Sequence, residues 1–280
     1  MTSEAIKQPR ARVNAPIVAL LSVIGIVILV PIAGLLYLSF TSTNPPAGAA
    51  WYERFSLEQF DMLFQQVDFG KYALNSLKVS LVYTIPAVFS SMLAGYAFAR
   101  LRARGAKMLF AIVVATMLIP LFVYIVPLFV VYSRLGLTNS LLPWLFWGIG
   151  GNAFYIFLFR QFFDAFPAEM EDAAMLDGLT RWGIFTRIVI PNSWTAISTV
   201  AILAFSGAWG DYLIQKVLLF NDSASTLPVR LGAGVFDPTG SVILMPATLA
   251  GVLLYLIPPV LIFIIFQRQI VQGTATSGLK

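Results

Sequence analysis

The sequence predicts an all-α membrane protein with six transmembrane helices. The 280 residues are 59% hydrophobic and only 11% charged, whereas soluble domains are about one quarter charged. Six largely apolar stretches are long enough to cross the roughly 30 Å hydrocarbon core of a bilayer. Basic residues are concentrated in alternate connections between these stretches, which is the bias that orients membrane proteins.

The composition also excludes several kinds of chemistry. The chain has no cysteine and no histidine. This excludes a disulfide framework, a Cys/His zinc site and a hydrolase that uses an imidazole base. The net charge of +5 comes from residues beside the apolar stretches, so it indicates membrane orientation and not nucleic-acid binding. We expect one membrane domain without an internal repeat, a metal site or a cofactor.

The first expected span follows a basic segment. Lys7, Arg10 and Arg12 precede an apolar run from Pro16 to Phe40. That run is too long for the apolar region of a cleaved signal peptide, so we expect it to be retained. Prolines within several apolar stretches favour kinked helices. The six expected spans are residues 16–40, 72–99, 108–133, 141–163, 193–220 and 246–266.

The basic residues orient these spans. Twelve fall on the side of the two termini and of the second–third and fourth–fifth connections, and six fall on the opposite side. Because cytoplasmic loops carry an excess of Lys and Arg, both termini are expected in the cytoplasm. The expected organisation is a cytoplasmic segment (1–15), a six-span membrane domain (16–266) and a cytoplasmic tail (267–280).

Two connections on the outer side are long. In the first, residues 41–70, Ser56 is followed three residues later by Gln59, the spacing of a capping box. This predicts a surface helix from Leu57 to about Gln66 with Ser56 as its N-cap. The last outer connection, residues 221–246, is punctuated by Gly, Pro and Ser and is expected to be a loop.

The most polar passage, residues 164–192, falls on the expected cytoplasmic side. Pro167 suits the first position of a helix, and the acidic residues that follow lie in its opening turns, where the helix dipole stabilises anions. Asp177 and Gly178 are expected to end this helix, because glycine adopts the left-handed conformation at little cost. The acidic residues are Glu169, Glu171 and Asp172.

A second short helix is expected after this turn. Thr180 can cap it, and Trp182, Phe185 and Ile188 recur every three residues, which predicts one apolar face. Pro191 is expected to stop the helix before the fifth span. The passage is therefore expected to form an L-shaped helical hairpin near the membrane surface.

The spacing in this passage resembles the EAA loop of ATP-binding-cassette (ABC) importer permeases, whose pattern is E-A-A-x3-G-x9-I-x-L-P. Asp172 stands where Glu is usual, with Glu171 before it, and Ile190 replaces Leu. Arg181 and Gly183 also depart from the sugar-permease pattern near the start of the second helix. The resemblance implies that this loop contacts an ATPase, through Glu171, Asp172, Ala173, Ala174, Asp177, Gly178, Ile188 and Pro191.

Four other segments resemble the smaller permease of maltose-type carbohydrate uptake systems. They are residues 95–100 (GYAFAR), 135–140 (LGLTNS), 209–212 (WGDY) and 266–273 (FQRQIVQG). Gly210 departs from the polar residue common at its position. The resemblance covers nearly the whole chain and implies a type I ABC importer permease fold with a cytoplasmic coupling-helix hairpin.

The resemblance also implies a division of labour. No G-x-x-x-x-G-K-[ST] sequence is present, so this chain cannot bind ATP through a Walker A loop. ATP and Mg²⁺ are expected on a dimer of cytoplasmic ATPase subunits, and this chain is not expected to be an enzyme. The other implied partners are a second permease in a heterodimer, an extracytoplasmic solute-binding protein and the lipid of the bacterial cytoplasmic membrane.

Polar residues within spans are costly and are therefore candidates for a substrate pathway. Asp211 lies between Trp209 and Tyr212, and a carboxylate beside aromatic rings suits a sugar. Alternatively, Asp211 is an interfacial residue within an aromatic belt. It also stays open whether the partner permease supplies most ligand contacts. Further candidates are Asn75, Tyr124 and Asn152.

Other functional classes are less consistent with the sequence. An ion-coupled secondary transporter or channel would work without an ATPase, but such proteins usually show internal repeats or paired intramembrane charges, and neither is visible. An intramembrane enzyme is disfavoured by the absence of His, Cys and clustered carboxylates in the spans. The alternative for residues 169–191 is a surface or re-entrant helix pair without a partner. The sequence does not identify the sugar.

Overall fold

The computed structural model describes residues 15–277 apart from residues 44, 46, 47, 49 and 102. Residues 1–14 of the expected N-terminal segment lie outside the described residues. The first half of the chain contains α1 (Ala15–Ser39), the 3₁₀ helix η1 (Trp51–Arg54), α2 (Glu58–Gln66), α3 (Phe69–Arg100), α4 (Ala106–Thr116), α5 (Leu121–Arg134), α6 (Leu142–Gly150) and α7 (Ala153–Asp164).

The second half contains the polar passage and the last two spans. Its elements are α8 (Ala168–Leu176), α9 (Arg181–Ile184), the π-helix η2 (Phe185–Val189), α10 (Ile190–Asn192), α11 (Trp194–Gly210), α12 (Leu213–Leu218), α13 (Leu227–Gly232), α14 (Met245–Tyr255) and α15 (Ile257–Ser277). Within the described part of the chain, β-pairing is limited to two isolated bridges, Thr41–Phe55 and Phe236–Ile243.

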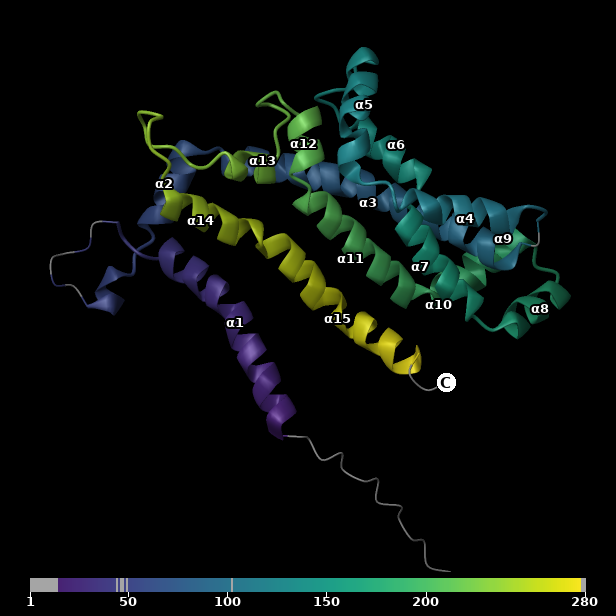
Figure 1. Cartoon of the computed structure of the whole chain (residues 1–280). Coiled ribbons are helices and arrows are strands. Elements are labelled where there is room, and N and C mark those ends of the chain that lie inside the picture. Colours follow the sequence, from purple (N-terminus) through teal and green to yellow (C-terminus); the bar gives the residue numbers. More distant parts are fainter. Residues whose placement is uncertain (1–14, 44, 46–47, 49, 102, 278–280) are drawn as a thin grey trace, which may run out of the picture.

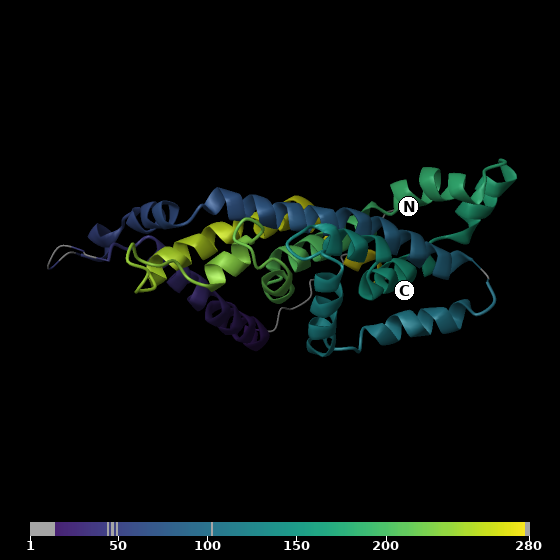
Figure 2. The ribbon, with the colours of Figure 1, turned by 90° about the horizontal axis from the view of Figure 1, so that it is seen from above.

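The longest helix, α3, forms the axis of an elongated bundle (Figures 1 and 2). Helices α6, α7 and α11 pack along it, and α1 contacts α14. Figure 1 shows α8 and α9 at one end of the bundle and α2 and α13 at the other. The expected outer and cytoplasmic connections therefore lie at opposite ends.

The structure contains four helical segments that are long and apolar enough to cross a membrane, and two bent pairs of helices. The four segments are Pro16–Ser39, Phe69–Arg100, Leu142–Asp164 and Met245–Gln267. The bent pairs are Ala106–Thr116 with Leu121–Arg134, at 93°, and Arg181–Asn192 with Trp194–Gly210, at 77°. The prediction of an all-helical membrane fold is confirmed. Beyond the last segment, α15 stays helical through Ser277, within the expected tail.

Two of the expected spans are not continuous. The third span breaks before Pro120, which has an extended backbone (φ −64°, ψ 140°) and is the N-cap of α5. Proline has no backbone N–H, so it has no donor to place in a helix. The fifth was expected to run to residue 220 but ends at Gly210. Asp211 follows in an extended conformation, and a separate helix, α12, begins at Leu213. Both breaks place irregular backbone beside the cavity described below.

Glycines allow α3 to approach α6 and α7 closely. A Cβ added at Gly95 would lie 2.6 Å from the Cβ of Phe159, and one at Gly148 would lie 2.6 Å from the Cγ of Pro86. Real side chains do not tolerate such contacts, so a larger residue would force these helices apart. Pro86 itself lies within the continuous α3.

The outer connections differ from their predictions in two places. Ser56 accepts a hydrogen bond from the backbone N–H of Glu58 (3.0 Å), whereas the side chain of Gln59 is buried and donates to the carbonyl of Thr41 (3.0 Å). The predicted capping box is therefore wrong: the N-cap of α2 is Leu57 and not Ser56, and a tertiary hydrogen bond removes Gln59 from the box. The last connection is also not only loop, since it contains α13, which begins at Leu227 after the N-cap Thr226.

Candidate functional site

The first helix of the hairpin, α8, begins and ends close to the predicted residues. Pro167 is its N-cap, extended at φ −60° and ψ 124°, so the predicted first-turn position is one residue wrong. Gly178 has φ +83° and closes the C-terminal turn, where Leu179 N donates to Ala174 O at 3.0 Å. The prediction that Gly178 adopts the left-handed conformation and ends the helix is confirmed.

The second helix departs from the predicted α-helical face. Thr180 caps it as expected, with its Oγ1 accepting from Gly183 N at 3.2 Å. The backbone then widens into the π-helix η2. A π-helix bonds each residue to the fifth and not the fourth along, so the register of the buried face shifts. Trp182, predicted on that face, is 58% exposed, whereas Ile184 and Val189 are buried.

The helix also continues past Pro191. It ends at Asn192, and the 77° bend into the fifth span occurs at Ser193. Ser193 is fully buried, and its hydroxyl donates to the carbonyl of Val189. The helix therefore ends one residue beyond the predicted stop at Pro191. This bend lies between the hairpin and the fifth span, outside the passage that was predicted to be L-shaped.

A buried apolar cluster fixes the base of the hairpin to the bundle. Phe159 and Phe163 of α7 stack on each other, and Phe163 meets the ring of Tyr96 of α3 edge-on. Phe185 of the hairpin packs against the same Tyr96 ring, with centroids 5.0 Å apart. Because these rings belong to one buried cluster, a displacement of the hairpin base is transmitted to α3 and α7.

The two adjacent acids of the EAA-like sequence face in different directions. Glu171 lies 3.1 Å from the Nε of Arg100 at the end of α3, and the two side chains are 13% and 16% exposed. The hydroxyl of Tyr96 donates to the other carboxylate oxygen at 3.2 Å. Arg100 also donates to the carbonyl of Phe166. Asp172, in contrast, is exposed.

The free surface of the hairpin carries several large apolar side chains among its charged ones. Leu176, the last residue of α8, is 90% exposed, and Met170, Met175 and Trp182 are also exposed. Ala173 is exposed beside them, whereas Ala174 is buried. Exposed aromatic and aliphatic side chains grouped outside a membrane span are typical of a protein interface.

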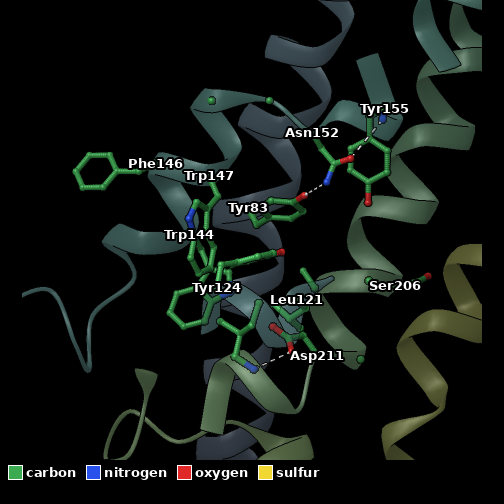
Figure 3. Close-up of a pocket in the computed structure, with 16 residues that line it drawn as sticks. Tyr83, Leu121, Tyr124, Trp144, Phe146, Trp147, Asn152, Tyr155, Ser206 and Asp211 are labelled. Carbon is green, nitrogen blue, oxygen red and sulfur yellow. Dashed lines mark hydrogen bonds between the residues drawn. The ribbon is translucent and has the colours of Figure 1, made fainter. Parts of the chain in front are cut away.

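A cavity of about 810 Å³ lies between the helices of the bundle (Figure 3). Residues of α3, α5, α6, α7 and α11 line it. Three of the six predicted substrate candidates, Tyr124, Asn152 and Asp211, lie in its wall. Its aromatic lining residues were not predicted from the sequence. They are Tyr83, Trp144, Phe146, Trp147 and Tyr155.

Hydrogen bonds to backbone N–H groups and to one another hold the polar side chains of the cavity in place. Asn152 is the N-cap of α7, with its Oδ1 accepting from Phe154 N at 2.9 Å. Its Nδ2 donates to the hydroxyl of Tyr83 at 3.3 Å (Figure 3). Asp211 accepts from Ile214 N at 3.1 Å through Oδ1. These contacts leave an amide, hydroxyls and a carboxylate beside aromatic rings.

The other three substrate candidates do not line this cavity. Trp209 is buried, stacks on Tyr255 and donates to its carbonyl at 3.1 Å. Tyr212 accepts from Lys216 Nζ at 2.7 Å. Asn75 donates to two carbonyls of the connection between α12 and α13. Each of these side chains has a packing or anchoring contact in the structure.

The same fold occurs in a solved transporter. The chain is similar to a bacterial ABC transporter involved in the import of the acidic polysaccharide alginate, with a TM-score of 0.76 and 23% identity, over 90% of this chain and 94% of that one. The fold, with its six candidate spans and its polar hairpin, is that of an ABC importer permease subunit.

The family of the chain follows from its sequence. Residues 87–276 match the family described as the binding-protein-dependent transport system inner membrane component, and the chain belongs to this family. It is 31% identical over 220 residues to the lactose transport system permease protein LacG of Rhizobium radiobacter, covering 76% of this chain and 77% of LacG. It is 32% identical to the arabinooligosaccharides transport system permease protein AraQ of Halalkalibacterium halodurans over 210 residues, 74% of this chain and 72% of AraQ.

Family membership gives the general role of the chain. It is a multi-pass inner-membrane permease subunit of an ABC importer, and its transport depends on a binding protein. The family is one of transporters and not of enzymes. Membership implies an ATPase and a solute-binding protein as partners.

Proposed function

We propose that the substrate of this importer is a sugar or sugar derivative and that this chain forms half of its pathway. The observation that carries the proposal is the cavity, in which aromatic rings face the same space as Asn152 and Asp211. Sugars present hydroxyls that need hydrogen-bond partners and C–H faces that pack on rings. Relatives described as lactose and arabinooligosaccharide permeases support this substrate class.

The test is uptake of labelled sugars by the assembled transporter with Asp211→Asn. The amide keeps an oxygen for the hydrogen bond from Ile214 N, so the start of α12 is retained while the charge is removed. We expect weaker uptake or altered sugar selectivity. Phe220→Ala, at an exposed residue outside the cavity, is the control. Unchanged uptake and selectivity with Asp211→Asn would remove this residue from the pathway.

We further propose that the hairpin docks on a separate ATPase subunit that binds ATP and Mg²⁺. The exposed apolar side chains of α8 and α9, with Asp172, Ala173 and Gly178, would form the docking surface. Glu171, Ala174 and Ile188 would support it from within, because they are buried or half-buried. Asp177 and Pro191 would shape its turns. Two ATPase copies would serve this chain and a second permease in a heterodimer.

We also propose the orientation and organisation that the basic residues predict. Both termini would lie in the cytoplasm, with a membrane domain over residues 16–266 between the segments 1–15 and 267–280. The placement of the hairpin and of α2 at opposite ends of the bundle supports opposite sides for these connections (Figure 1). Labelling of single cysteines introduced at Leu176 and Leu57 from each side of the membrane would test the orientation.

A further inference from the structure

A second cavity, of about 460 Å³, lies between the end of α3, the start of α4 and α7. This is the end of the bundle at which the hairpin lies (Figure 1). Its charged lining consists of three cations and one carboxylate, contributed by Arg104, Lys107, Arg160 and Asp164. The site is therefore positively charged, and its ligand is expected to be an anion.

Arg160 is paired with Asp164, whereas the other two cations of this cavity have no carboxylate partner within the described part of the chain. Arg160 has its guanidinium carbon 3.8 Å from the ring centroid of Phe110. Its Nε lies 3.5 Å from the Asp164 carboxylate but makes no hydrogen bond to a described residue. Arg104 and Lys107 are exposed and form no ion pair within the described part of the chain. Donors are thus available to an incoming oxyanion.

The remaining wall of the cavity is apolar. Phe98 and Phe110 meet edge-on at 5.4 Å. The other lining residues of α4 are Ala106 and Phe110, which lie on the same helical face as Lys107. Helix α4 is the first half of a candidate span, so we expect Arg104 and Lys107 at the boundary between headgroups and hydrocarbon.

We propose that this cavity binds the headgroup of an anionic phospholipid. The phosphate would contact Arg104, Lys107 and Arg160, and the acyl chains would lie along the apolar wall that includes Phe98 and Phe110. Basic pockets between transmembrane helices recognise anionic headgroups in this way. A free phosphate would satisfy the charges but would leave this apolar wall without a partner.

The test is native mass spectrometry of the whole transporter, purified and supplied with phosphatidylglycerol or phosphatidylcholine. We expect the transporter to retain phosphatidylglycerol selectively. In the Arg104→Gln/Lys107→Gln variant, the affinity for this lipid should fall by about fivefold for each removed charge. Arg134→Gln/Lys216→Gln removes two exposed cations elsewhere and should leave retention unchanged. The mass of the complex in the same spectra shows that each variant assembles.

Three outcomes would overturn the proposal. Equal retention of the two lipids would show that the headgroup charge is not recognised. Equal loss in both double variants would assign the effect to overall charge. Displacement of phosphatidylglycerol by millimolar inorganic phosphate, at unchanged salt, would identify a site for a free anion in place of a lipid.

Discussion

Glu171 of the hairpin is paired with Arg100 at the end of α3, whereas its neighbour Asp172 is exposed. The pair joins residues 95–100 and the EAA-like passage, two segments that each resemble sequences of ABC importer permeases. Tyr96 of the first segment also donates to Glu171, and Gly95 allows α3 to lie against α7. The first segment therefore holds the hairpin in place.

Neutralising either partner of the pair is expected to impair coupled transport. Removing one member of a largely buried ion pair leaves the other charge without compensation. We expect Arg100→Gln and Glu171→Gln each to reduce uptake per ATP hydrolysed several-fold in reconstituted transporter. The exchange Arg100→Glu/Glu171→Arg should restore part of it, since the bond from Arg100 to the Phe166 carbonyl is not replaced.

Glu169→Gln is the matched control for this pair, because Glu169 is exposed in the first turn of the same helix. Sugar uptake per ATP hydrolysed by the Glu169→Gln transporter should equal that of the unaltered transporter. If the exchanged pair were no better than the single variants, the charge interaction would not be what positions the hairpin.

Substitutions of Gly178 are expected to separate backbone strain from contact with the ATPase. At φ +83° an ordinary L-residue costs about 1–2 kcal/mol, although an added Cβ would meet no atom within 4 Å. Asn tolerates this conformation better than Ala or Leu. We expect coupled uptake to fall slightly with Gly178→Asn, more with Gly178→Ala and most with Gly178→Leu.

The measurement is sugar uptake together with ATPase activity of the same preparations. A larger loss for Leu than for Ala would report a surface that an ATPase covers, because the two share the backbone strain. Full uptake with Gly178→Leu would contradict the assignment of this turn to the docking surface.

Leu176 is expected to contribute to ATPase affinity without stabilising the permease. The side chain is 90% exposed, and burying a leucine is worth about 1.5–3 kcal/mol. Leu176→Ser should therefore weaken binding of the ATPase about tenfold or more, measured by titration in detergent. Leu57→Ser, at the exposed N-cap of α2, should leave this affinity unchanged. Equal effects of the two variants would rule out a specific contact at Leu176.

The parts of the fold that follow from local patterns could be predicted from the sequence. The lengths of the apolar runs fix the number of spans, and Thr180 and Gly178 act as cap and turn through their own backbone chemistry. The features that depend on tertiary contacts could not be predicted. Gln59 leaves its expected capping role to bond Thr41, and the π-helical register of residues 185–189 depends on packing against α3 and α7.

The candidate site likewise contains some residues that the sequence could predict and others that it could not. Polarity within a span identified Asn152 and Asp211, which do line the cavity. It also selected Asn75, whose amide instead holds the outer connection. The rings of Tyr83 and Trp147 could not be predicted as lining residues, because the sequence does not distinguish an aromatic side chain facing lipid from one facing a cavity.

Acid is expected to loosen the outer end of the bundle. Hydrogen bonds from Lys71 and Tyr72 hold the pKa of the Asp222 carboxyl below its usual value. A lowered folded-state pKa stabilises the protein above the unfolded value, near 3.9, and this contribution is lost as the pH falls through the folded pKa. The protection of the amides of residues 221–226, taken relative to their intrinsic exchange rates at each pH, should therefore fall below about pH 4. In Asp222→Asn the same amides should already be less protected at neutral pH, and acid should reduce their protection no more than it does in the rest of the chain. An acid step that persists in this variant would assign the titration to another group.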